Sequence, residues 1–444
     1  MAPTPANVTV MRTPAETGLG QLFERLRGSL PGDVAVRDAA LSGFKERGLP
    51  HRRVEEFKYF DLRALMRDAA PPAERPASQE IAAALDGVRA FQDLSAVRLA
   101  IVNGHLATER LDASSLPDGI EVVPLTDALT SGHPLLSTLG SVAIARDNPV
   151  MQLNTAFMSD GAVIRIPAGA EPRQPIALHF VNTGDAAFST ATRVLVVVEE
   201  GASATVLESH EGPDGLGYQP NGAVEFVLGD GARVRHVRLN AEGRDALALS
   251  TLTAKLGAKA SFGTLNVVVG SGIARHQVFV AFAGEGSSAE VDGVTLLNGR
   301  QHSDATLVLD HAVPHCTSRE VFKTILDGEA TGVFQGKIIV RPRAQKTDGA
   351  MRSDTLLLSD GATMNNKPEL EIFADDVVCG HGATCGALDD DLLFYLKSRG
   401  LPKAEAESLL LQAFVGPPLE AVEHEGVRGA LISIVEGWLA ARGR

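Results

Sequence analysis

The sequence predicts a mainly β protein, with a parallel β-helix over residues 160–385 between helical regions at both ends. Over these residues, short runs rich in β-branched side chains alternate with turn residues, and no long helical pattern intervenes. A second observation is an internal repeat in which Gly is followed by Ala or Ser. The third is the helical spacing of apolar residues before and after the β region.

The repeat has a period near 30 residues. It begins at Gly169, Gly201, Gly231, Gly257, Gly286 and Gly361, and the first four gaps are 32, 30, 26 and 29 residues. A propeller blade needs about 40–45 residues, so this period favours a solenoid whose coils stack on one another. We expect the glycines at the corners of the coils, where a positive φ is required. The alternative is that such pairs are simply frequent in a chain with 44 glycines.

Residues 1–95 form the predicted N-terminal helical region. Apolar residues repeat at helical spacing from Leu19 to Leu30, and a second helix is expected over 33–47, ending at Gly48. Residues 96–159 are expected to contain short strands, near 98–104 and 120–124, and connecting segments.

Residues 386–444 form the predicted C-terminal helical region. Three aspartates precede Leu392, and Lys397 lies near the end of the same pattern, which suits the dipole of a helix. A second helix begins at Pro402 and is expected to end before residues 416–418, Gly-Pro-Pro. A third carries an apolar face between Leu431 and Leu439.

Composition and charge exclude several classes of protein. The net charge of −14 argues against a nucleic-acid binder or a protein of anionic membrane surfaces, since both are normally basic. No apolar run approaches the ~20 residues of a membrane span. The cysteines, Cys316, Cys379 and Cys385, include no Cys-x-x-Cys pair, which excludes a zinc ribbon and a disulfide framework. No secretory signal is recognised at the N-terminus, so we expect a cytoplasmic protein with free thiols.

The segment Cys379-Gly380-His381-Gly382 combines a thiol and an imidazole two residues apart. On a strand these two positions point to the same side, and thiolate and imidazole both suit iron and zinc. Two ligands are too few for a stable structural metal site, so a metal here would need a partner subunit or a small ligand. The spacing leaves open a plainer interpretation, a buried cysteine and a core histidine. Cys385 follows on the same segment and is either a further thiol or a packing residue.

A second group, His311, His315 and Cys316, has metal-ligand residue types. On a helix the two histidines would share a face. Pro314 lies between them and the flanks predict strand and loop, so turn and packing roles are favoured over a metal site.

Several motifs resemble the SufB/SufD family of the SUF iron–sulfur cluster assembly system. The segment 377–401, VVCGHGATCGALDDDLLFYLKSRGL, is similar to the C-terminal signature of the SufD branch of that family. The stretches 334–338, 344–349 and 353–360 resemble parts shared by both branches. Residues 48–59 resemble the N-terminal helical element, with Phe57 where the family usually has Trp. Cys385 stands where the family more often has an aliphatic residue. The resemblance spans most of the chain and is strong over 320–400.

The resemblance implies a right-handed parallel β-helix and a non-catalytic scaffold subunit. It implies pairing with SufB through the β-helices, docking of the SufC ATPase on the C-terminal helices, and a transient iron–sulfur cluster built at the SufB–SufD interface. His381 matches the family's cluster ligand and Cys379 a nearby thiol. The SufC dock would include Leu392, Phe394, Tyr395, Leu396 and Arg399. For Phe394, Tyr395 and Leu396, burial in the chain's own core is the open alternative. A role in iron entry, a homodimer of the isolated chain and flavin binding by the complex stay open.

Two other functions remain as alternatives. In the first alternative the chain is a purely structural partner with no ligand of its own. In the second it is a β-helix enzyme acting on polysaccharide. Such enzymes stack sugars on aromatic rings, and a chain with one Trp and three Tyr suits that chemistry poorly. No ordered pair of carboxylates with an acid/base layout is recognised either.

Overall fold

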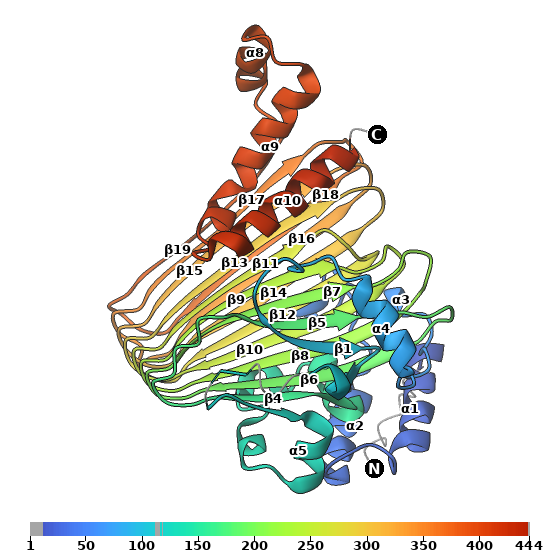
Figure 1. Ribbon diagram of the computed structural model, residues 1–444. Helices are drawn as coiled ribbons and strands as arrows, with labels where there is room; N and C mark the ends of the chain where they lie inside the picture. The colour runs from blue at the N-terminus through green and yellow to red at the C-terminus, as the bar shows by residue number, and fades with distance from the viewer. Residues whose placement is uncertain (1–11, 112–115, 118, 443–444) are drawn as a thin grey trace, which may run out of the picture.

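The computed structural model describes residues 12–111, 116–117 and 119–442 and contains a parallel β-solenoid of about 8 turns. Each coil gives one strand to each of two facing sheets (Figure 1). The nine-stranded sheet, sheet A, contains β3 (Glu121–Pro124), β4 (Asp160–Ile166), β6 (Ser189–Val198), β8 (Gln219–Leu228), β10 (Leu247–Leu256), β12 (Ile273–Phe282), β14 (His302–His311), β16 (Thr331–Val340) and β18 (Thr363–Ile372).

The ten-stranded sheet, sheet B, begins with the antiparallel pair β2 (His105–Leu106) and β1 (Val97–Val102). It continues in parallel through β5 (Ile176–Val181), β7 (Ser203–Glu211), β9 (Arg233–Ala241), β11 (Ser261–Val268), β13 (Ser288–Leu297), β15 (Thr317–Leu326), β17 (Asp348–Leu357) and β19 (Val378–Gly386). The predicted mainly β fold with a parallel solenoid core is therefore confirmed.

The strands stack in strict register, so equivalent side chains form columns along the solenoid. One inward column of sheet A is apolar throughout and consists of Val196, Phe226, Ala254, Val280, Leu309 and Ile338. Full burial of each large aliphatic or aromatic side chain stabilises the fold by about 1.5–3 kcal/mol. The sequence repeat therefore reflects the stacking of equivalent core residues, one from each coil.

The corner glycines follow the prediction in part. Gly169, Gly201, Gly231 and Gly286 have φ between 66° and 70°. Gly257 does not take this conformation. Lys259, two residues later, does, with φ of 56°. An added Cβ at Gly257 would lie 2.7 Å from Asp230 Oδ1, so this glycine is required by close contact with the preceding coil. The prediction of a positive φ was therefore wrong at Gly257.

Gly361 also lacks the positive φ that the repeat predicted, and close packing again gives the reason. A Cβ on Gly361 would lie 2.8 Å from the backbone oxygen of Gly328 on the preceding coil. At both positions the absence of a side chain matters more than the backbone conformation.

The N-terminal helices lie against sheet A and around the first coils (Figure 1). They comprise α1 (Pro14–Leu26), α2 (Val34–Arg47), η1 (Glu55–Phe57), α3 (Leu62–Leu65) and α4 (Ser78–Asp86), and after the first strands α5 (Leu125–Ser131), α6 (Ala143–Arg146) and α7 (Pro149–Phe157). Short 3₁₀ turns η2 (Thr108–Arg110) and η4 (Pro134–Thr138) join them.

Arg275 of β12 anchors the segment around η1. Its guanidinium lies 3.9 Å from the centre of the Phe57 ring and donates to the backbone oxygen of Glu56 at 2.9 Å. The carboxylate of Asp304 forms an ion pair with the Arg275 guanidinium, with Nη1 and Oδ2 2.8 Å apart. The Phe57 ring and the Glu56 backbone thus hold the segment around η1 onto the solenoid.

The C-terminal region forms three helices, α8 (Asp390–Ser398), α9 (Lys403–Glu420) and α10 (Glu425–Arg442). Helices α9 and α10 pack on the outer face of sheet B, where Leu411, Val415, Leu431 and Val435 meet Val267, Val294 and Ile325. Helix α8 projects beyond the last coil and buries no residue (Figure 1). None of the described helices is long and apolar enough to cross a membrane.

Helix α9 does not end before Gly416, as the prolines predicted. It continues through Pro417 and Pro418 to Glu420. Proline costs helix stability because it lacks an N–H and its ring meets the carbonyl four residues earlier. Pro418 and Leu419 are both buried, and Leu419 packs in the cluster that α9 and α10 form with sheet B. This packing compensates.

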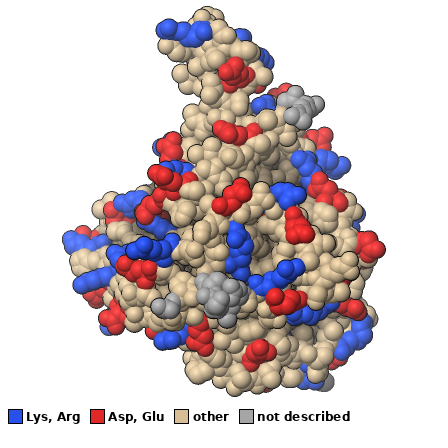
Figure 2. All heavy atoms as spheres, in the orientation of Figure 1, with Lys and Arg blue, Asp and Glu red and all other residues tan. Residues whose placement is uncertain are grey.

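Charges of both signs are scattered over the face seen in Figure 2, and no single-sign patch dominates it. This distribution gives no sign of a polyanion-binding surface on that face.

Candidate functional site

The residues Cys379, His381 and Cys385 lie on β19, the terminal strand of sheet B. They are in register with Gly349, Met351 and Thr355 of β17, which are buried and face the interior of the solenoid. The three side chains therefore share the inward face, as the alternation along a strand predicts. Within the part of the chain that the structure describes, no further coil covers them, so His381 and Cys385 are exposed and Cys379 is half-buried.

The plainer interpretation, a buried cysteine and a core histidine, fits neither residue in full, because Cys379 is only half-buried. Cys379 packs against the solenoid core from its edge. The exposed His381 lies outside that core. The pair thus lies at the mouth of the solenoid interior.

Burial raises the pKa of the Cys379 thiol, and the carboxyl groups of Asp348 and Glu320 act in the same direction. Burial also raises the pKa of Cys385. Both thiols are therefore protonated at neutral pH in the isolated chain. A metal ion that takes one of them as a ligand must displace its proton.

Glu320 of β15 lies in the same inward column, below Met351 and His381. It is 1% exposed, and neither carboxyl oxygen has a hydrogen-bond partner of normal geometry. Burial raises its pKa to about 8. A neutral carboxylic acid therefore lies beneath the open end of the solenoid, and the sequence analysis did not identify it.

The described residues contain no group of three or more His, Cys, Asp and Glu side chains placed to hold a metal ion. Cys316 is buried at a corner, where its sulfur lies 3.4 Å from the hydroxyl of Ser287. His311 stacks on Phe282 inside the solenoid, and His315 takes a corner conformation with φ of 61°. These residues have packing and turn roles, as predicted.

The last strands of the two sheets differ in how far they are protected against pairing with another chain. Strand β18 carries three charged residues, Lys367, Glu369 and Glu371, and it contains Pro368, which has no backbone N–H to donate. In β19, Val378–Gly386, there is no Lys, Arg, Asp, Glu or Pro. Charged residues and prolines commonly prevent unwanted pairing at sheet edges. The edge that carries Cys379 and His381 is therefore open to a partner strand.

The projecting helix α8 carries the predicted partner-docking residues. Leu392, Phe394 and Tyr395 are 51%, 72% and 53% exposed, and Leu396 is partly buried. Arg399 follows the helix, and its guanidinium lies over the Tyr395 ring at 5.1 Å. Large apolar side chains held in solvent on a projecting helix are typical of a protein-binding surface.

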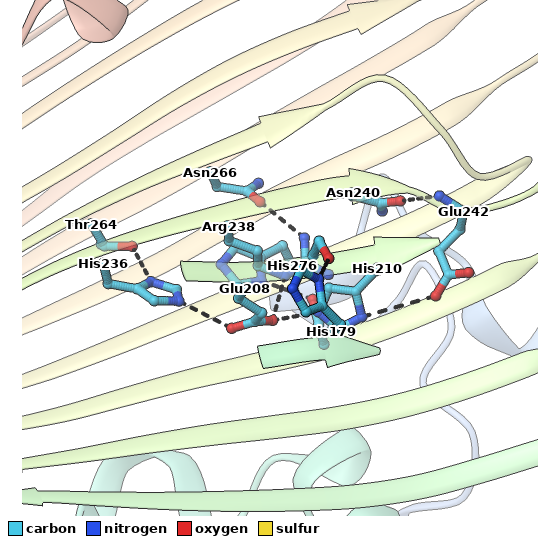
Figure 3. A network of polar contacts seen from close by, with 12 residues as sticks. His179, Glu208, His210, His236, Arg238, Asn240, Glu242, Thr264, Asn266 and His276 are labelled. Carbon is cyan, nitrogen blue, oxygen red and sulfur yellow. Dashed lines mark hydrogen bonds and ion pairs between the residues drawn. The ribbon is translucent and has the colours of Figure 1, made fainter. Parts of the chain in front are cut away.

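A polar network fills the interior of the middle coils (Figure 3). The carboxylate of Glu208 accepts from Arg238 Nε at 3.0 Å and lies 3.0 Å from His236 Nε2. His210 makes a further short contact to it. Arg238 also donates to Asn266, and His236 bonds Thr264. These residues are all at least nine-tenths buried.

The charges of this network are set by its contacts. Burial raises the pKa of Glu208, but hydrogen bonds from His210 and His236 and the charge of Arg238 outweigh it and hold the pKa well below its ordinary value. Burial lowers the pKa of His210, and it raises that of the neighbouring Glu242 to about 7. Glu208 and Arg238 are thus a charged pair inside the core.

Comparison with known proteins agrees with the family resemblance of the sequence motifs. Residues 180–414 match the family model described as the SufBD core domain of SUF system iron–sulfur cluster assembly, and residues 27–178 match the SufBD N-terminal region. The chain is 33% identical to an iron–sulfur cluster assembly SufBD family protein of Synechocystis over 86% of each chain. It is 28% identical to the iron–sulfur cluster assembly protein SufD of Escherichia coli over 87% of this chain and 88% of that one. A SufBD family protein of Mycobacterium tuberculosis is 30% identical over 70% of this chain and 78% of its own length.

Proposed function

Because the chain belongs to the SufBD family of the SUF iron–sulfur cluster assembly system, as a homologue of SufD, we propose that it is a non-catalytic scaffold subunit. In this proposal it pairs with a SufB subunit through the open end of the solenoid. The nascent iron–sulfur cluster is the cargo of that interface. The SufC ATPase docks on the C-terminal helices, and the complex acts in the cytoplasm.

One observation carries the proposal. Cys379 and His381 lie side by side on an exposed, unprotected edge strand, without a third potential ligand beside them among the described residues. Two ligands from one chain and the rest from a partner give a site that exists only in the assembled complex. Such a site suits a scaffold, because few ligands release a cluster more readily than a closed set of four.

Each predicted residue has a role in this proposal. His381 is a cluster ligand through its imidazole, and Cys379 is an auxiliary thiol that loses its proton on binding iron. The exposed thiol of Cys385 lies further along the same inward face and is a secondary candidate. Leu392, Phe394 and Tyr395 supply apolar contact area for SufC, with Leu396 and Arg399 beside them.

Replacing Ala383 by lysine is expected to leave the isolated chain folded and to weaken its pairing with SufB. Ala383 is exposed and faces inward at the open end, next to His381, so a lysine there can reach solvent until a partner covers it. A trapped ammonium costs more than about 1.4 kcal/mol, so affinity falls about tenfold or more. The measurement is the amount of variant chain that co-purifies with tagged SufB.

The matched control is Ala383→Ser, which adds a small polar group in register with Ser353 and is expected to co-purify normally. Equal recovery of Ala383→Lys and Ala383→Ser with SufB would show that this end of the solenoid is not the pairing surface.

A further inference from the structure

A row of polar side chains on the outer face of sheet B ties the edge strand β19 to its neighbour β17 and continues to β15. Lys323, Asp354 and Thr384 are in direct register on β15, β17 and β19. The hydroxyl of Thr384 donates to Asp354 Oδ1 at 2.7 Å, and Lys323 Nζ donates to Asp354 Oδ2 at 2.7 Å. We name these three residues the outer row.

Asp354 is the centre of the outer row. It is 3% exposed and accepts a third hydrogen bond, from Arg352 Nε at 2.8 Å. Burial raises the pKa of its carboxyl, but the hydrogen bonds from Lys323, Thr384 and Arg352 outweigh this and keep the pKa below its ordinary value. The carboxylate is therefore charged at neutral pH. Its contacts are charge-assisted, which makes them stronger than hydrogen bonds between neutral groups. The Lys323 side of the carboxylate is sheltered from solvent, whereas Thr384 and Arg352 are exposed.

The other end of the outer row reaches the C-terminal helices. Lys323 Nζ lies 4.8 Å from the centre of the Phe414 ring on α9. Its side chain is 14% exposed, so the ammonium is held between the ring and Asp354. A continuous set of contacts thus runs from Phe414 through Lys323 and Asp354 to Thr384. Thr384 is three residues from His381 on the same strand.

We propose that the outer row couples the position of helix α9 to the edge strand that carries Cys379 and His381. Displacement of the Phe414 ring releases the Lys323 ammonium, which weakens its bond to Asp354 and frees that carboxylate to shift away from Thr384. Asp354 is a positioning residue, since it acts on the site through Thr384. The meaning of the coupling for cluster assembly rests on the proposed function, but the coupling itself does not.

The test is amide hydrogen exchange of residues 378–386 in the full-length chain. Thr384→Val removes the hydroxyl at nearly constant shape and is expected to speed exchange in this segment about tenfold, as the loss of about 1.4 kcal/mol implies. Thr384→Ser keeps the hydroxyl and is the matched control, with exchange expected within about twofold of wild type.

The coupling is tested by changing α9 instead of the strand. Phe414→Leu removes the ring from Lys323 without touching β19, and it is expected to speed exchange of residues 378–386 by several-fold. Lys323→Met interrupts the same set of contacts at Lys323, and it is included in case Phe414→Leu loosens α9 itself. The double variant Phe414→Leu with Thr384→Val is expected to exchange no faster than Thr384→Val alone, because both act through one set of contacts.

Three results would overturn the coupling. The first is unchanged exchange of residues 378–386 in both Phe414→Leu and Lys323→Met. The second is a double variant whose acceleration is the product of the single ones, which is the mark of independent sites. The third is an equal acceleration by Asp310→Asn, which removes a comparable ion pair with Arg341 on sheet A. The readout needs no iron, sulfide or partner, so a failure of the scaffold proposal leaves it interpretable.

Discussion

Replacing Glu208 by alanine is expected to lower the free energy of unfolding by about 3–5 kcal/mol. The substitution leaves the Arg238 guanidinium, whose side chain is 3% exposed, as an unpaired charge inside the solenoid. It also removes the acceptor of His236 and His210. Unfolding in denaturant, followed by circular dichroism, measures the change.

The matched control is Glu200→Ala, an exposed glutamate at a corner of the same solenoid, which is expected to change stability by less than about 0.5 kcal/mol. Replacing Glu208 and Arg238 together by leucine is expected to recover much of the loss, because no unpaired charge then remains. If Glu208→Ala unfolds at the same denaturant concentration as Glu200→Ala, the interior network does not stabilise the fold.

Replacing Glu320 by glutamine is expected to stabilise the protein at alkaline pH and to have little effect near pH 4.5. The folded-state pKa of Glu320 is raised, to about 8, above its ordinary value of 4.5. As the pH rises from 4.5 to 8, the unfolded chain releases the proton while the folded chain retains it, so stability is lost across that window. Glutamine carries no proton to lose. The gain expected at pH 8.5 is on the order of 4 kcal/mol.

The measurement is the free energy of unfolding of wild type and Glu320→Gln at pH 4.5 and pH 8.5. Asp292 and Glu242 also have pKa values raised by burial, to about 7, so the difference between the two proteins is the informative quantity. Glu329→Gln, at an exposed corner, is the control and is expected to show no pH-dependent gain. A gain for Glu320→Gln that is the same at both pH values would contradict a buried, neutral carboxylic acid.

The solenoid could be predicted from the sequence because its repeat is a repeat of the backbone. Corners that need a positive φ, such as Gly201 and Gly231, mark successive coils directly. The shared face of Cys379 and His381 follows from strand alternation alone. The exposure of these two residues could not be predicted from alternation, because it depends on β19 being the last strand of its sheet.

The interior polar residues were missed because a polar side chain in a strand is ordinarily assigned to the solvent side. Glu208 and Arg238 face inward instead, and only the register of β7 on β9 brings them together. Aligning successive coils by the repeat would have shown polar residues recurring at equivalent places. Glu320 gives no such signal, since its neighbours in the column are Val291 and Met351.

The extent of α9 could not be predicted for a different reason. Local rules end a helix before Pro417, but they do not include the burial of Pro418 or the packing of Leu419 against sheet B. Tertiary packing there exceeds the local cost of proline.

Anaerobic reconstitution with ferrous iron and sulfide, followed by ultraviolet–visible spectroscopy, tests the central claim most directly. The samples are this chain alone, the chain co-purified with SufB and SufC, and the same complex carrying His381→Ala or, as a control, His51→Ala in the N-terminal region. A cluster shared across the open end of the solenoid predicts sulfide-to-iron charge-transfer bands in the wild-type and His51→Ala complexes only. A stable cluster on the isolated chain, or equal bands in the His381→Ala complex, would contradict it.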